Sequence, residues 1–169
     1  QEAPTSKSVR FKWREHVTKT VSENGEALEK FCNALKDGNS EVVEQSLNNY
    51  LKRTISIRDT FVKKQMKENF YHGILLGILG FQQNWSVSSN KESGDGYSDI
   101  LIKTEDQEIG IIIEIKYAET GNLEAVSEEA LKQIEDRRYE EQLLEEGVEH
   151  ILKYGIAFYK KKCKVMVVK

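Results

Sequence analysis

The chain has 169 residues and a formal net charge of −3 at neutral pH. This length suits one domain with a short extension, and the acidic balance excludes the uniformly basic surface of many non-specific nucleic-acid binders. Two cysteines without a paired motif exclude a disulfide framework and a zinc knuckle. The longest apolar run, residues 74–81, is too short to cross a bilayer. Since no signal peptide is visible either, the sequence predicts a cytoplasmic protein with no membrane contact.

The first third of the chain is polar with helical periodicity. Residues 1–8 are expected to be a disordered or cloning-derived leader, and residues 9–58 a helical extension. Two apolar stripes recur every three or four residues, the first ending before Gly38 and the second following Ser40, which is the predicted N-cap. Their members are Leu28, Phe31, Cys32 and Leu35, and then Val43, Leu47, Tyr50 and Leu51.

One long helix is predicted over residues 59–80, with Asp59 as its cap. Its second half, from Phe70 onward, is apolar nearly all round, which indicates a buried helix. Glu68 lies where the polar half ends, and on its own an ordinary surface acid explains it as well as a functional one. His72 is predicted to be a packed or hydrogen-bonded residue rather than a ligand, since the histidines form no metal-ligand pair.

Strands alternate with helices in the remaining two thirds. Three strands joined by glycine-containing turns are predicted at residues 85–89, 98–103 and 109–117. A second long helix is predicted over residues 123–146, ending at Gly147, followed by a hairpin of residues 154–159 and 163–168. This order predicts an α/β fold in which a mixed central β-sheet is flanked by helices.

Charge is distributed unevenly along these elements. Acids dominate the second long helix, whereas basic residues gather ahead of the first long helix and near the C-terminal hairpin. Such a division fits a protein that meets a polyanion from one side, and solvated helix and turn surfaces explain it equally well. The basic residues are Lys52, Arg53, Arg58, Lys63, Lys64 and Lys67, and then Lys160, Lys161, Lys162 and Lys164.

Two acids and a lysine interrupt the apolar strands. Because strand side chains alternate, Glu114 and Lys116 point to the same face, about 7 Å apart. If Asp99 lies across the hairpin from Glu114, two carboxylates share one pocket, and at about 4 Å they repel by about 4 kcal/mol at an effective dielectric near 20. A divalent cation turns that repulsion into coordination. The alternative is that a lone Glu-Ile-Lys marks only the point where a strand emerges into solvent.

Several motifs follow one another between residues 60 and 169 in a specific order. They are Glu68 with Phe70-Tyr71-His72-Gly73, the turn Gly94-Asp95-Gly96 ahead of Asp99, Ile113-Glu114-Ile115-Lys116, Gln133-Ile134, and Tyr154-Gly155-Ile156-Ala157-Phe158. This set resembles the PD-(D/E)XK nuclease superfamily, in detail the domain C-terminal to certain bacterial and archaeal AAA-ATPase-like proteins. The resemblance implies a restriction-endonuclease-like core over residues 59–169, preceded by the helical linker to an ATPase domain of the same longer protein.

The resemblance also implies a metal site and its ligands. Asp99 and Glu114 match the two acids that bind the metal ion, and the backbone carbonyl of Ile115 is the third ligand. Glu68 matches the acid on the first helix that often completes the cage. Hard oxygen ligands of this kind suit Mg²⁺ or Mn²⁺, which polarise a phosphate and lower the pKa of water.

Two further residues match catalytic positions of the superfamily. Lys116 matches the lysine that orients the attacking water and offsets negative charge in the transition state. Gln133 matches a glutamine of exonuclease-type relatives, although the tyrosine that those relatives carry four residues later is Arg137 here.

The leading hypothesis is therefore a Mg²⁺-dependent nuclease that acts on nucleic acid, with DNA as the expected substrate. One rival is a catalytically silent nuclease-fold module for nucleic-acid or protein binding. A second rival is a structural domain whose N-terminal helices serve as a docking or homodimer surface. The ATPase expected as a partner is not in this chain, because the sequence has no phosphate-binding loop ending in Gly-Lys-Ser/Thr.

Overall fold

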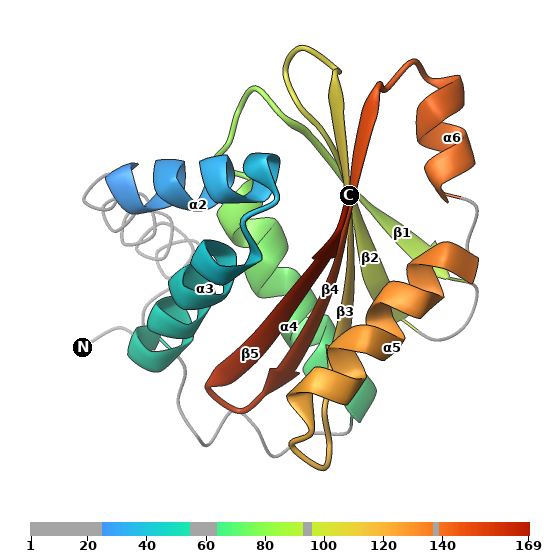
Figure 1. Ribbon diagram of the computed structural model, residues 1–169. Coiled ribbons are helices and arrows are strands. Elements are labelled where there is room, and N and C mark those ends of the chain that lie inside the picture. Colours follow the sequence, from blue (N-terminus) through green and yellow to red (C-terminus); the bar gives the residue numbers. More distant parts are fainter. Residues whose placement is uncertain (1–24, 55–63, 93–95, 137–138) are drawn as a thin grey trace, which may run out of the picture.

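The computed structural model describes residues 25–54, 64–92, 96–136 and 139–169. Within these ranges five helices accompany five strands (Figure 1). In chain order they are α2 (Gly25–Asp37), α3 (Ser40–Thr54), α4 (Lys64–Leu79), β1 (Ser86–Glu92), β2 (Gly96–Lys103), β3 (Ile109–Tyr117), α5 (Leu123–Asp136), α6 (Tyr139–Glu145), β4 (His150–Tyr159) and β5 (Lys162–Val168).

The strands form one mixed sheet in the order β1-β2-β3-β4-β5. All neighbouring pairs are antiparallel except β3 and β4, which run parallel. Parallel neighbours need a long connection, and here α5 and α6 supply it. The predicted α/β architecture, with a mixed sheet between helices, is confirmed and is consistent with a restriction-endonuclease-like fold.

Buried side chains form a cluster on each face of the sheet. The larger cluster joins α2, α3 and α4 to the face that carries Ile111, Ile113 and Ile115. The smaller joins α5 and α6 to the face that carries Leu101 and Ile112. The central strand β3 is thus covered on both sides, as its continuous apolar sequence predicts. Because side chains alternate along a strand, Glu114 and Lys116 share the face of Ile112, beneath α5.

Two predictions about the long helices are wrong. The single helix expected over residues 123–146 is divided into α5 and α6, which run in different directions (Figure 1). Between Ile134 and Leu143 the sequence lacks a continuous apolar stripe, so each helix buries its own short face. The half of α4 after residue 70 is also not buried all round: Phe70 is 37 % exposed, whereas Tyr71 on the sheet side is 1 % exposed. The predicted cap Asp59 lies outside the described residues.

Side chains at the start of α3 correct a smaller prediction. Asn39, not Ser40, caps this helix, because its Oδ1 accepts the N–H of Val42 at 3.2 Å. The preceding Gly38 has a φ of 71° and ends α2 where the sequence predicted.

Helices α2 and α3 pack directly on the sheet. The hydroxyl of Tyr154 in β4 donates to the carbonyl of Leu35 in α2 at 2.7 Å. From α3, Asn48 Oδ1 accepts the N–H of Cys163 at 2.8 Å and Glu44 Oε1 accepts the N–H of Val165 at 2.9 Å. These α3 side chains therefore satisfy backbone groups along β5, an edge strand of the sheet.

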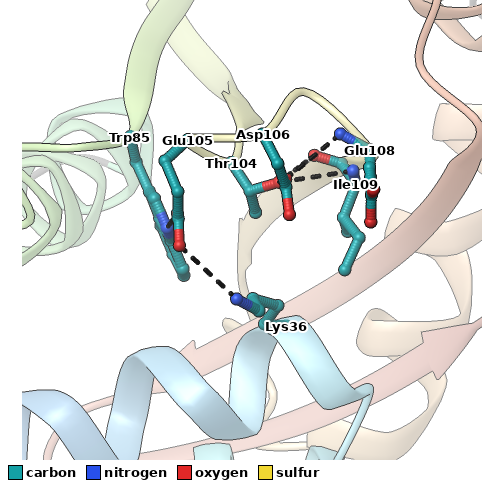
Figure 2. A network of polar contacts seen from close by, with 7 residues as sticks. All are labelled: Lys36, Trp85, Thr104, Glu105, Asp106, Glu108 and Ile109. Atoms are coloured by element: carbon teal, nitrogen blue, oxygen red, sulfur yellow. Dashed lines mark hydrogen bonds and ion pairs between the residues drawn. The ribbon is translucent and has the colours of Figure 1, made fainter.

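A polar network ties α2 to the turn between β2 and β3 (Figure 2). Lys36 Nζ lies 3.6 Å from Glu105 Oε1, and Glu105 Oε2 accepts the indole N–H of Trp85 at 2.8 Å. Within the turn, the hydroxyl of Thr104 donates to Asp106 Oδ1 at 2.6 Å. The network fixes the turn that precedes β3 at the end of the sheet opposite Glu114.

Helix length and composition also bear on membranes. None of the helices in the described ranges combines the length and apolar character that crossing a bilayer demands. Both cysteines are buried free thiols.

Candidate active site

Asp99 and Glu114 lie opposite each other on β2 and β3. They are register partners in this antiparallel pair, which puts their Cα atoms roughly 5 Å apart and their side chains on the same face. Both are buried, with exposed fractions of 0 % and 1 %. The structure thus brings together the two acids that the sequence singled out.

A glycine beside Glu114 explains how α5 closes over it. Gly155 of β4 is the register partner of Glu114 on the other side. A Cβ atom at Gly155 would lie 2.3 Å from the carbonyl oxygen of Ser127 and 2.9 Å from Cγ of Leu131 in α5. Only glycine therefore permits this approach, which places the backbone of α5 against the sheet beside Glu114. Its place in the middle of a strand is the sequence signal for a close contact, and the sequence prediction gave it no role.

Lys116 follows Glu114 on the same face of β3. It is half-buried, in contrast to the fully buried acids. Between them Ile115 directs its side chain into the larger core cluster on the other face. A carboxylate pair inside the protein thus lies next to an ammonium group nearer to solvent, which can meet an anion that enters from outside.

Glu68 approaches this region from α4, on the other side of the sheet. Its Oε1 accepts the backbone N–H of Tyr117, three residues beyond Glu114, at 3.1 Å. Pairing between β2 and β3 ends at Glu114, so this N–H takes a side-chain acceptor instead of a strand partner. In the described parts of the chain, no three or more His, Cys, Asp and Glu side chains converge in a group that could hold a metal ion.

The donor set nevertheless fits a hard dication. The buried carboxylates of Asp99 and Glu114, supplemented by the backbone carbonyl of Ile115, are the oxygen ligands that Mg²⁺ and Mn²⁺ prefer. Mg²⁺ commonly takes one or two carboxylates and keeps several water molecules, so two acids suffice.

His72 lies behind Asp99 on α4. It is 4 % exposed, and its burial lowers the pKa of the imidazole, while a backbone hydrogen bond with Asp99 and the Asp99 charge act in the opposite direction. The prediction that this histidine is packed is confirmed. Its contact with the strand position of Asp99 had no signal in the sequence.

Gln133 belongs to the helix that covers the two acids. It is half-buried, one residue before Ile134, which packs into the smaller core cluster. Its role stays a prediction, and Arg137, the residue that departs from the tyrosine of exonuclease-type relatives, lies outside the described residues.

Comparison with known families gives a match that covers the candidate site. A family model described as the PD-(D/E)XK nuclease superfamily matches residues 66–168, from α4 to the end of β5. The match includes all the residues of the candidate site and leaves out α2 and α3. Comparisons with curated proteins and with solved structures gave no match.

Proposed function

The chain belongs to the PD-(D/E)XK nuclease superfamily, and from this premise we propose that it hydrolyses phosphodiester bonds of nucleic acid, with DNA as its substrate. Nucleases of this superfamily generally use divalent metal ions, and Mg²⁺ or Mn²⁺ is the cofactor proposed here. One observation carries the proposal: the buried carboxylates of Asp99 and Glu114 face each other on adjacent strands, with Lys116 next on the same face.

The two acids and the carbonyl of Ile115 would hold the metal ion. When bound, the ion supplies Lewis acidity toward the phosphate oxygens and lowers the pKa of the attacking water. Because α5 closes over Glu114 at Gly155, the carboxylates act in a water-poor region, where each electrostatic interaction is stronger than in bulk water.

Lys116 and two further residues complete the proposal. The ammonium of Lys116 orients the attacking water and offsets the negative charge that develops on the phosphate in the transition state. Glu68 would complete the ligand cage by exchanging its hydrogen bond to Tyr117 for the ion. Gln133, on the covering helix, would contact the substrate.

Cleavage by matched variants tests this proposal. Labelled DNA and RNA of one sequence, single- and double-stranded, are incubated with wild type, Glu114→Gln, Lys116→Met and the exposed control Glu108→Gln. We expect Mg²⁺-dependent cleavage that EDTA abolishes, and a loss of at least about a hundredfold in the first two variants, the scale of losing a group that stabilises transition-state charge. Glu108→Gln should cleave as wild type does. Undiminished cleavage by Glu114→Gln with an unchanged melting curve would contradict the proposal.

A second candidate is a nuclease-fold module that binds nucleic acid or protein without cleaving. The engagement of Glu68 by the backbone of Tyr117, rather than by the acid pair, favours it. Wild type that binds DNA tightly and leaves it intact with Mg²⁺ and with Mn²⁺ would establish this second function.

The proposal extends to the setting of the domain. The resemblance of its ordered motifs supports attachment to an AAA-like ATPase domain in one longer cytoplasmic protein, with a homodimer as a further assembly. An ATPase domain found in the same natural polypeptide would support the first point. Light scattering of the purified chain tests the second.

A further inference from the structure

Two lysines flank a pair of tyrosines at the end of the sheet that carries the acid pair. Lys67 Nζ lies 4.5 Å from the centre of the Tyr117 ring, Tyr117 and Tyr159 have ring centres 6.0 Å apart, and Lys160 Nζ lies 5.1 Å from the centre of the Tyr159 ring. We name these four residues the lysine–tyrosine ledge. They come from the beginning of α4, the ends of β3 and β4 and the turn after β4, which gather at the lower end of the sheet in Figure 1.

Packing beneath the ledge holds it in place. The hydroxyl of Tyr71 donates to the carbonyl of Lys160 at 2.6 Å, and its ring stacks on Phe158 at 4.4 Å between centres. On the other side Gly121, with a φ of +79°, lies against the Tyr159 ring, since a Cβ there would be 3.5 Å from Cε1. These contacts fix the Tyr159 ring and the backbone of Lys160, from which the ledge is built.

In the described residues no carboxylate forms an ion pair with Lys67, Lys160 or the two lysines that follow, Lys161 and Lys162, whereas neighbouring Lys164 pairs with Glu44 at 3.7 Å. Contact with a ring face leaves an ammonium group its charge and its hydrogen-bond donors. In a chain with a net charge of −3, ammonium groups without an ion pair among the described residues favour an anionic ligand.

The rings themselves are not available to bases. Tyr117 is 3 % exposed, and Tyr159 is half-buried between Tyr117, Gly121 and Lys160. A nucleotide at this surface meets ammonium groups rather than a stacking platform, so phosphates are contacted and base identity is not read.

The ledge adjoins the candidate site at the end of β3, where Tyr117 points to the α4 face of the sheet and Glu114 and Lys116 point to the α5 face. Lys67 precedes Glu68, whose carboxylate accepts the N–H of Tyr117, and Tyr117 follows Lys116. From Glu114 to Tyr117 the strand advances about 10 Å, the axial length of roughly three nucleotides of one strand.

We infer that the lysine–tyrosine ledge, extended by Lys161 and Lys162, binds backbone phosphates of a nucleic-acid strand a few nucleotides from the scissile one, regardless of base sequence. The inference rests on the proposed function, because it takes the strand on the ledge to lead into the acid pair. It adds a substrate-binding surface that acts by position and charge alone.

Binding and cleavage are measured separately to test it. Anisotropy of labelled single-stranded oligonucleotides in EDTA compares wild type, Lys160→Glu/Lys161→Glu and the control Lys30→Glu/Lys132→Glu, which changes the net charge equally on exposed positions of α2 and α5. We expect the ledge variant to bind at least about tenfold more weakly, with a salt slope reduced by about 1.4 for two lost contacts. Oligo-dT and oligo-dA should bind wild type equally.

The outcomes separate this inference from the nuclease proposal. A ledge variant that binds as tightly as the control, or a wild type that binds no oligonucleotide, overturns the ledge. If all three proteins cleave with Mg²⁺ and the ledge variant matches wild type in cleavage rate and in affinity, the nuclease proposal stands and the ledge is overturned. If the ledge variant alone loses binding and no protein cleaves, the ledge stands and the nuclease proposal fails.

Discussion

Gly155, a residue without a side chain, determines how closely α5 packs beside the acid pair. Glu114 is flanked by Asp99 on one strand and by Gly155 on the other. The acids bring the chemistry, but the missing side chain at Gly155 lets the backbone of α5 reach the sheet beside them. A substitution at this glycine is therefore expected to act on both stability and site geometry.

Gly155→Ala should destabilise the protein by about 1–3 kcal/mol, the range for an inserted methyl group in a well-packed interior. The added carbon would collide with the carbonyl of Ser127 and force α5 outward. Urea unfolding measures the change. Gly73→Ala is the matched control: a Cβ there meets no atom within 4 Å, so the helix should gain about 0.5–1 kcal/mol. Equal stability of the two variants would refute the close-approach argument.

The shared face of Glu114 and Lys116 was predictable, whereas the supporting contacts of the acid pair were not. Alternation along β3 predicts that shared face, and the pairing of Asp99 with Glu114, on which the predicted metal site depended, is present in the structure. The bond from Glu68 to Tyr117 and the contact of His72 with Asp99 depend on which face α4 covers. Hydrophobic periodicity identifies a helix but does not say on which side of a sheet it packs.

At the scale of elements, α3 protects the edge of the sheet. The backbone N–H groups of Cys163 and Val165 in β5 are bonded by Asn48 and Glu44, one helical turn apart. In the sequence these two polar residues lie off the apolar stripe and resemble ordinary surface positions. Their partners are more than a hundred residues away, and no local pattern contains that information.

Asn48→Ala should lower the free energy of unfolding by about 1–3 kcal/mol, because it leaves the N–H of Cys163 without its acceptor. Asn49→Ala, the same change on the exposed neighbouring position of α3, should have little effect. Chemical denaturation of both proteins gives the comparison. If Asn49→Ala is as damaging as Asn48→Ala, helix propensity rather than the edge contact explains the loss.

At the scale of the whole molecule, buried thiols and phenols with raised pKa values lie in elements from both halves of the chain. Burial raises the pKa of the Cys32 thiol in α2 to about 11 and also raises the pKa of Cys163 in β5. The same cause raises the pKa of the Tyr71 and Tyr154 phenols. The folded core thus keeps these groups protonated at a pH at which an unfolded chain would release protons.

Stability should accordingly fall as the pH rises through about 8.5, the ordinary pKa of an unfolded thiol. Their folded-state pKa is raised, so the folded state binds more protons in this window, and the stabilisation is complete only below it. Urea unfolding midpoints measured from about pH 7 to about pH 10 give the slope of this decline in stability. Cys32→Ala should show a shallower decline. A midpoint that is constant up to pH 10 would contradict burial of the thiols.

The contacts between α3 and β5 have a consequence for biosynthesis. A ribosome completes α3 more than a hundred residues before it makes the strand that α3 covers. Until then the apolar side of α3 lacks the strand on which it packs, which exposes the nascent chain to association with other molecules. We therefore expect α3 to be covered by α2 or by a chaperone until β5 has been synthesised.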